Sequence, residues 1–302
     1  MQELLPVCPV CESINTRREP FHYEFKGRQL HGYLCGKCGI IFVFPQPTSE
    51  EISQLYSAEY FESGDFRCGH EGNAFAPGSQ DHLVNGPALA GIRSIRPSGR
   101  LLEVGCAGGA FLNAARNHGY DVVGVELSGE ACAKARAEFG LNVIQGDLLD
   151  AKFPGASFDV VYMGDVLEHL PDPIRAVNEL HRILRSGGLL VLEVPAQTNT
   201  LFSRLGFPAY GLLRMSTTVR LPPYHLFEYR PKSIRFLLEH IGFDVLRVEQ
   251  TCIPPKEINL RGGLFQRAGK MILQYPNFVL TRTLQVYGDR LAVYATRGQS
   301  RQ

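Results

Sequence analysis

The sequence predicts a doubly wound α/β fold with a mostly parallel sheet, preceded by a small cysteine-bearing module. From residue 100 onward, short apolar strands alternate with amphipathic helices, a pattern typical of a sheet covered by helices on both faces. A glycine-rich turn at residues 105–109 joins the first of these strands to a helix, as in folds that bind a ligand at the carboxyl ends of their strands. Two Cys-x-x-Cys pairs lie ahead of this region and indicate a separate metal-binding unit.

The individual elements follow from the spacing of apolar residues. Strands are expected at residues 100–104, 121–126, 142–145, 158–163, 188–194, 243–250 and 290–296. Helices are expected at residues 109–118, 129–139, 173–185 and 231–241 and, nearer the N-terminus, at 50–63 and 81–95 with a loop at 64–80 between them. We therefore expect a module at residues 1–47, a helical linker at 48–98 and an α/β domain at 99–302. Two stretches, near 196–223 and 252–288, break the alternation and are expected to be insertions.

The composition bounds the class of protein. The chain has 302 residues, of which 44% are hydrophobic, and its formal net charge is +1. A balance this close to neutral argues against a dedicated nucleic-acid binder, which usually carries a strong basic excess. The N-terminus lacks the basic region of a signal peptide, and no apolar run is long enough to span a bilayer, so we expect a cytoplasmic protein.

The two Cys-x-x-Cys pairs predict a zinc site. They consist of Cys8 and Cys11, and of Cys35 and Cys38. In a reducing compartment such pairs favour a metal over disulfides, and four thiolates can surround one Zn²⁺ tetrahedrally. Because four thiolates leave no open coordination position, we expect a structural zinc in a zinc-ribbon-like module. The alternative is a set of redox dithiols or unmetallated cysteines.

The glycine-rich turn does not match a dinucleotide-binding loop. That loop requires glycine at three positions, which here hold Gly105, Ala107 and Ala110. The mismatch disfavours an NAD-dependent oxidoreductase. Another carboxylate, Glu126, ends the next strand about twenty residues later, where it can accept hydrogen bonds from both hydroxyls of a ribose.

The segment Glu103-x-Gly105-x-x-x-Gly109 resembles the first motif of the class I S-adenosylmethionine-dependent methyltransferases. The likeness extends over residues 100–297 and implies a seven-stranded sheet of order 3-2-1-4-5-7-6, with S-adenosylmethionine as the cofactor. It implies that Glu103 faces the amino-acid end of the cofactor and that Asp147 and Leu148 lie at the adenine. Asp147 as a turn cap and Asp165 as a helix cap are the structural alternatives. The cofactor-binding residues expected in all are Glu103, Gly105, Cys106, Ala107, Gly109, Glu126, Leu127, Asp147, Leu148, Gly164 and Asp165.

Two histidines are candidates for the general base that a hydroxyl acceptor would need. His169 follows the fourth strand, on the side of the sheet where ligands bind, although a structural or pocket-lining role also fits it. His225 begins the return from the first insertion, with Tyr224 and Glu228 as weaker neighbouring candidates.

The insertions are rich in arginine and in apolar residues. Residues 199–223 contain Arg204, Arg214 and Arg220 and no acidic residue. We expect both insertions to form a basic lid over the acceptor, which would suit an anionic substrate such as a nucleotide-sugar, a phosphate-linked saccharide or a carrier-bound chain. The alternative is an ordinary solvated basic surface. Peripheral contact with a membrane stays open, and the sequence predicts no oligomeric state.

The resemblance therefore implies methylation of a small-molecule or saccharide acceptor. An N-terminal zinc module on this domain is similar to that of sugar methyltransferases. The sugar C-methyltransferases carry a further C-terminal domain, so we expect O-methylation instead. An rRNA base methyltransferase is the first alternative, but residues 1–47 are not strongly basic and no Asn-Pro-Pro-aromatic signature follows the fourth strand. A non-catalytic protein that binds the cofactor or a partner is the second alternative.

Overall fold

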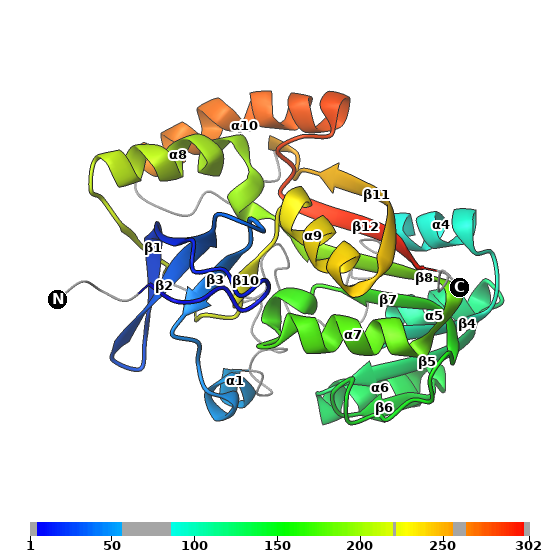
Figure 1. Cartoon of the computed structure of the whole chain (residues 1–302). Coiled ribbons are helices and arrows are strands. Elements are labelled where there is room, and N and C mark those ends of the chain that lie inside the picture. The colour runs from blue at the N-terminus through cyan, green and yellow to red at the C-terminus, as the bar shows by residue number, and fades with distance from the viewer. Residues whose placement is uncertain (1–4, 56–85, 220–221, 256–263, 299–302) are drawn as a thin grey trace.

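The computed structural model describes residues 5–55, 86–219, 222–255 and 264–298. Its main feature is a seven-stranded sheet of order β11-β12-β8-β7-β4-β5-β6 (Figure 1). The strands are β4 (Arg100–Val104), β5 (Asp121–Glu126), β6 (Val143–Gln145), β7 (Phe158–Gly164), β8 (Leu184–Pro195), β11 (Phe243–Thr251) and β12 (Arg290–Arg297). Only β12 runs antiparallel to its neighbours in this sheet. The predicted seven-stranded, doubly wound fold and its strand order are confirmed.

Helices cover both faces of the sheet. One face is covered by α4 (Gly86–Ile95), α5 (Ala110–Asn117) and α6 (Gly129–Phe139), and the other by α7 (Pro173–Ile183) and α9 (Pro231–Ile241). Alternate residues of each strand feed the two cores: Leu101 packs with the first set of helices and Leu102 with the second. Helix α7 ends at Ile183, two residues earlier than expected, because β8 begins directly at Leu184.

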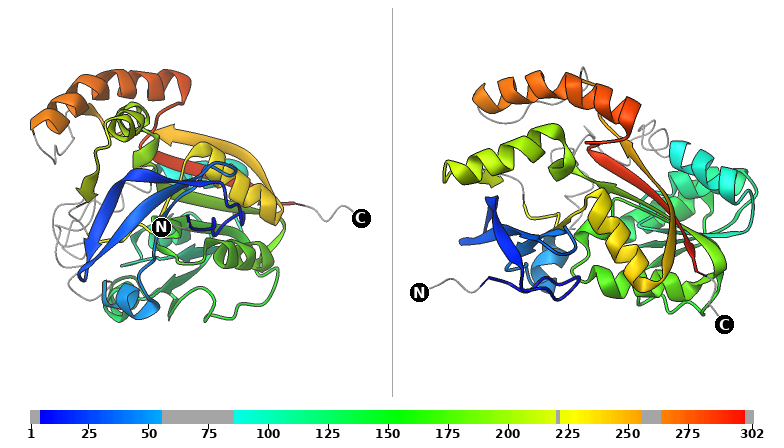
Figure 2. Two further views of the ribbon diagram at one scale, coloured as in Figure 1. Left: turned by 60° about the vertical axis from the view of Figure 1, so that its left-hand side comes forward. Right: turned by 45° about the horizontal axis from the view of Figure 1, so that its top comes forward.

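The cysteine-bearing module is built around three antiparallel strands, β1 (Thr16–Phe25), β2 (Arg28–Cys35) and β3 (Ile41–Phe44). Two short strands from much later in the chain extend its edges. β9 (Thr217–Val219) pairs in parallel with β1, and β10 (Phe227–Glu228) pairs antiparallel with β3. The result is a five-stranded sheet of order β10-β3-β2-β1-β9, beside the large sheet (Figure 2).

The module also shares a core with the large domain. Buried Cys8 and Ile40 of the module belong to the same apolar cluster as Phe227, Tyr229 and Ile234. The helix expected at residues 50–63 is described as α1 (Ser49–Leu55), and the helix expected at 81–95 as α4. The loop expected at 64–80 lies outside the described residues.

The two stretches that broke the alternation hold helices. The first contains the short 3₁₀ helix η2 (Gln197–Asn199), α8 (Leu201–Leu212) and β9, and the second contains α10 (Leu264–Leu284). The two long helices lie side by side (Figures 1 and 2), and the backbone amide of Leu201 donates to Asn277 Oδ1 at 2.7 Å. Since β8 and β11 both run antiparallel to β12, both insertions leave the sheet at its carboxyl edge. Among the described residues no helix has the length and apolarity that a membrane span requires.

Candidate active site at the carboxyl edge of the sheet

The glycine-rich turn between β4 and α5 depends on backbone conformations that favour glycine. Gly105 has φ 74°, Gly109 has φ 81°, and Ala107 between them has φ 43°. A methyl group added at Gly105 would overlap the side chain of Val166, in the loop that follows β7. The turn therefore lies directly against the loop after β7.

Glu126, at the end of β5, holds this turn in place. One carboxylate oxygen accepts a hydrogen bond from the amide of Ala107 at 2.9 Å, and the other accepts one from the amide of Ser128 at 2.8 Å. Glu126 is buried, and burial raises the pKa of its carboxyl group. The residue expected to contact a ribose thus also fixes the loop that would surround the ligand.

Glu103, in β4, is a buried carboxylate whose Oε2 atom lacks a hydrogen-bond partner among the described residues. Burial raises the pKa of this carboxyl well above its ordinary value, and nearby Glu126 raises it further. An unsatisfied buried acceptor is costly unless a ligand supplies the donor. A cationic amino group would satisfy it, as the amino-acid end of S-adenosylmethionine would, so the site fits the expected cofactor.

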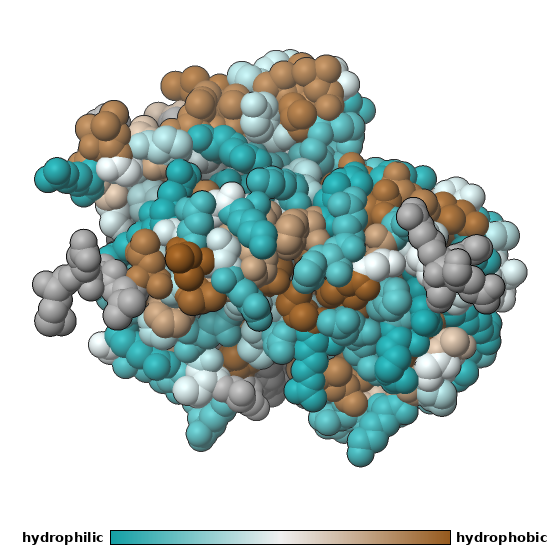
Figure 3. Space-filling model, in the orientation of Figure 1, coloured by the Kyte–Doolittle hydropathy of each residue, from teal (hydrophilic) through white to brown (hydrophobic). Residues whose placement is uncertain are grey.

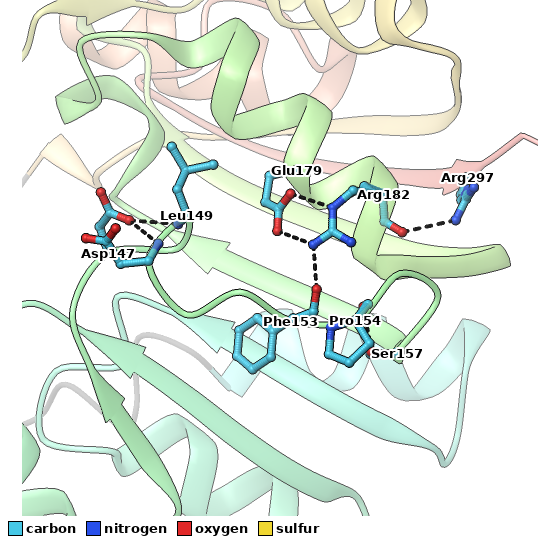
Figure 4. A network of polar contacts seen from close by, with 9 residues as sticks. Asp147, Leu149, Phe153, Pro154, Ser157, Glu179, Arg182 and Arg297 are labelled. Carbon is cyan, nitrogen blue, oxygen red and sulfur yellow. Dashed lines mark hydrogen bonds and ion pairs between the residues drawn. The ribbon is translucent and has the colours of Figure 1, made fainter.

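Three other predicted cofactor residues differ in exposure. Asp147 is exposed, and its Oδ1 atom accepts hydrogen bonds from the amides of Leu149 and Asp150 at 2.7 and 2.8 Å (Figure 4). It therefore caps the turn after β6, whatever else it contacts. Leu148 is buried, and Leu127 is exposed.

Cys106 contributes only its backbone to the turn. Its side chain is buried in the core beneath α5, against Leu112 and Gly124. A cofactor in the turn can therefore meet the peptide group of Cys106 but not its thiol.

Asp165, directly after Gly164 at the end of β7, belongs to an ionic network that the sequence did not reveal. It has φ 53°, and its carboxylate lies 2.7 Å from the guanidinium of Arg290 in β12. Arg290 also lies 3.9 Å from Glu193, which accepts a hydrogen bond from the Tyr162 hydroxyl at 2.6 Å. This role of Arg290 could not be predicted from the sequence, because an ion pair between residues so far apart leaves no local pattern.

The two candidate histidines lie together although they are distant in sequence. His169 ends the short 3₁₀ helix η1 (Leu167–His169), and His225 precedes β10; their ring centroids are 5.0 Å apart. His169 Nδ1 lies 2.8 Å from the carbonyl oxygen of Tyr224, and this hydrogen bond orients the ring. His225 Nδ1 lies 3.5 Å from Glu228 Oε1, and His169 Nε2 lies 3.5 Å from Glu168 Oε1.

The electrostatic surroundings of the two imidazoles differ. Burial, together with the nearby His225, lowers the pKa of His169 to about 3, so this ring is neutral. Burial also acts to lower the pKa of His225, but the carboxylates of Glu228 and Glu168 outweigh it, and the pKa is raised. The pKa of Glu168 is itself raised to about 8 by burial and by Asp165. Glu168 was not singled out from the sequence, although it stands directly between the strand end and His169.

The four predicted zinc ligands converge within the cysteine-bearing module. The Sγ atoms of Cys8 and Cys38 are 3.7 Å apart, those of Cys11 and Cys35 are 3.5 Å apart, and all four lie within 4.8 Å of one another. Thiolates around a tetrahedral Zn²⁺ at about 2.3 Å stand about 3.8 Å apart, so the cluster fits this ion.

The α/β domain of this chain is similar to known proteins. Residues 84–248, more than half of the chain, match the model of a methyltransferase domain family. A probable S-adenosylmethionine-dependent methyltransferase of Mycolicibacterium smegmatis is 30% identical over 50% of this chain and 54% of its own length. A ubiquinone biosynthesis O-methyltransferase of Xanthomonas campestris is 31% identical over 43% of this chain and 58% of its own. The chain thus spans about half the length of these curated relatives.

Solved structures support the fold. A SAM-dependent methyltransferase from Archaeoglobus fulgidus aligns with a TM-score of 0.50 at 22% identity, covering 71% of this chain and 93% of that one. The [4+2]-cyclase SpnF aligns with a TM-score of 0.56 at 21% identity, covering 84% and 98%. With the family match, the chain belongs to the S-adenosylmethionine-dependent methyltransferases. Because the fold also occurs in a protein titled a cyclase, the reaction has to be argued from the site.

Proposed function

We propose that this protein transfers the methyl group of S-adenosylmethionine to an oxygen atom of a small-molecule acceptor that binds beside His169 and His225. The observation that carries the proposal is the contact between the cofactor turn and the loop after β7. Gly105 lies against Val166, and the same loop continues through Glu168 to His169. A cofactor held by the turn would therefore lie next to the histidine cluster.

The protein has two tasks in this reaction. When bound, the cofactor supplies a methyl group on a good leaving group, so the chain must hold the acceptor in line and keep water out. A hydroxyl acceptor must also lose its proton. We assign that proton to His225, because Glu228 Oε1 lies 3.5 Å from its Nδ1 atom, raises its pKa and would stabilise the protonated ring that forms. His169, a neutral ring held by the carbonyl of Tyr224, would orient the acceptor.

The acceptor class is proposed from the insertions. The segment from α8 through β9 contains Arg204 and Arg214 and no acidic residue, which favours an anionic or carrier-linked substrate, including a phosphate-linked saccharide. Relatives are named for ubiquinone biosynthesis and for 27-O-demethylrifamycin SV, both small molecules. These names support a small-molecule acceptor over RNA.

We also propose that Cys8, Cys11, Cys35 and Cys38 hold a structural Zn²⁺ that supports the acceptor site. β3 pairs with β10, and the amide of Val43 in β3 donates to the carbonyl of Leu226, next to His225. An ordered module would therefore hold the His225 segment in place.

The test is methyl transfer from radiolabelled S-adenosylmethionine to a panel of sugar phosphates, nucleotide-sugars and quinols. We expect at least one acceptor to be labelled by the wild type, and the His225→Asn variant to lose that labelling while it still binds the cofactor. Labelling of ribosomal RNA alone would instead support the alternative of an rRNA base methyltransferase. Cofactor binding without methyl transfer to any class of acceptor would favour the alternative of a non-catalytic cofactor-binding protein.

A further inference from the structure

From Ile272 onward, where its side chains are described, helix α10 (Leu264–Leu284) exposes apolar side chains to solvent and buries polar ones against the protein. Ile272 is 72% exposed and Tyr275 is 67% exposed, with Val279 on the same face one turn further on. On the opposite face, Asn277 and Thr281 are each 1% exposed. Thr281 donates to the carbonyl of Asn277, and Asn277 accepts from Leu201. A helix on the surface of a soluble domain normally has the reverse arrangement.

Helix α8, beside it, continues the same exposed apolar surface. It has no buried residue. Leu212 is 86% exposed, and the side chains of Leu205, Leu213 and Met215 are also exposed. Figure 3 shows apolar side chains gathered along the rim of the molecule formed by these two helices. Single exposed apolar residues need no explanation, but two adjoining helices that both carry them mark an interaction surface.

The two helices and the short segments that follow them carry charges of one sign. Residues 196–219 and 264–288 contain no acidic residue. Among the arginines of these segments whose side chains the structure describes, Arg204, Arg214 and Arg282 are exposed. The surface therefore combines apolar side chains with positive charge, the combination found on helices that lie in the interface of a membrane.

We propose that the paired helices α8 and α10, here called the apolar rim, bind the surface of a membrane that contains anionic lipids. The charges favour this occupant over a second copy of the chain. In a two-fold dimer the same patch meets itself, so its arginines would face arginines with no carboxylate between them. Anionic headgroups complement those arginines, and Ile272, Tyr275 and Leu212 can enter the headgroup region. This inference does not depend on which acceptor is methylated.

The experiment is flotation of the full chain with vesicles of phosphatidylcholine alone or mixed with phosphatidylglycerol. We expect binding to the mixed vesicles that weakens as salt is raised. The Ile272→Ser/Val279→Ser variant should bind at least about tenfold more weakly, because two apolar side chains that would be buried in the membrane are lost. Arg214→Gln and Arg282→Gln should each weaken binding about fivefold.

Matched controls lie elsewhere on the surface. Ile14 is as exposed as the rim residues, and Arg175 in α7 is an exposed arginine. Ile14→Ser and Arg175→Gln should bind vesicles as the wild type does. Calorimetry with S-adenosylmethionine on each variant checks that the domain is folded, so a folding failure is distinguished from a loss of docking.

Three results would overturn the inference. The first is no binding of the wild type to anionic vesicles at low salt. The second is vesicle binding that is unchanged in the Ile272→Ser/Val279→Ser variant. The third is self-association in light scattering that this double variant abolishes, in the absence of vesicle binding, which would make the rim a dimer interface.

Discussion

The backbone amide of Leu226 donates a hydrogen bond to the carbonyl oxygen of Glu168 at 2.9 Å. This bond joins the loop after β7 to the segment that returns from the first insertion. It brings His225 beside His169, and Leu226 in turn accepts a hydrogen bond from Val43 of the cysteine module. The proposed acceptor side of the site is therefore assembled from three parts of the chain.

We predict that His225→Asn lowers kcat by about 10²- to 10⁴-fold, the usual contribution of a general base. The affinity for S-adenosylmethionine should stay unchanged, since His225 lies on the acceptor side. His118→Asn, an exposed histidine at the end of α5, is the matched control and should retain activity. A His225→Asn variant with wild-type kcat would remove His225 from the proposed mechanism.

The pH dependence of kcat should report the surroundings of His225. The groups around it are Glu228 on β10, His169 beside it, and Glu168 and Asp165 from the loop after β7. Since the unprotonated ring is the base and its pKa is raised, kcat should increase as pH rises through that pKa. Glu228→Gln removes an anion, which lowers the pKa, so this limb of the profile should move to lower pH. An unchanged pH profile in Glu228→Gln would argue against a functional pairing of Glu228 with His225.

Glu103→Gln should weaken binding of S-adenosylmethionine by about 10- to 100-fold, because a charged hydrogen bond to the ligand is lost. In the absence of ligand, the same substitution should stabilise the folded protein. The pKa of Glu103 is raised in the folded chain, so the folded state holds this proton more tightly than the unfolded state. Stability of the wild type should then fall as pH rises above the ordinary carboxyl pKa, and the variant should lose less. Denaturant titrations of both proteins at acidic and mildly alkaline pH check this.

Gly105→Ala should destabilise the fold and abolish tight cofactor binding, because it combines a strained positive φ with the overlap against Val166. Gly119→Ala is the matched control, since Gly119 has φ 91° but open space around it. We expect about 1 kcal/mol of destabilisation at Gly119, from strain alone, and more at Gly105. Equal losses at the two positions would mean that the close approach to Val166 does not matter.

Removal of the expected zinc should affect the acceptor before the cofactor. Chelation, or Cys38→Ser, should reduce methyl transfer at least about tenfold while binding of S-adenosylmethionine persists, because β10 pairs with the module and the cofactor turn does not. Cys252→Ser, outside the cluster, should leave the zinc content unchanged. Full activity after complete zinc loss would limit the module to a role away from the site.

The large sheet was predictable because its signals are local. The turn at residues 105–109, Glu126 at the end of β5 and the loop after β7 each sit next to the strand that positions them. The five-stranded small sheet was not predictable, because β9 and β10 are too short to leave a pattern and pair with strands nearly 200 residues away. The Asp165–Arg290 ion pair was not predictable for the same reason: its partners are far apart in the sequence.

For two residues, the position in a sequence motif did not predict where the side chain lies. Cys106 stands inside the cofactor motif, yet its thiol is buried in the core with Leu112. Glu168 stands beside a predicted residue and was not selected, although its burial and its contact with His169 place it in the cluster. Position in a motif predicts which peptide lies near a ligand, whereas side-chain direction depends on the packing around it.

The most direct test of the central claim is calorimetric titration of the purified chain with S-adenosylmethionine and, separately, with NAD. We predict micromolar binding of S-adenosylmethionine, no binding of NAD, and a marked loss of S-adenosylmethionine binding in Glu103→Gln. Well-folded protein that gives no heat with S-adenosylmethionine, or that binds NAD instead, would contradict it.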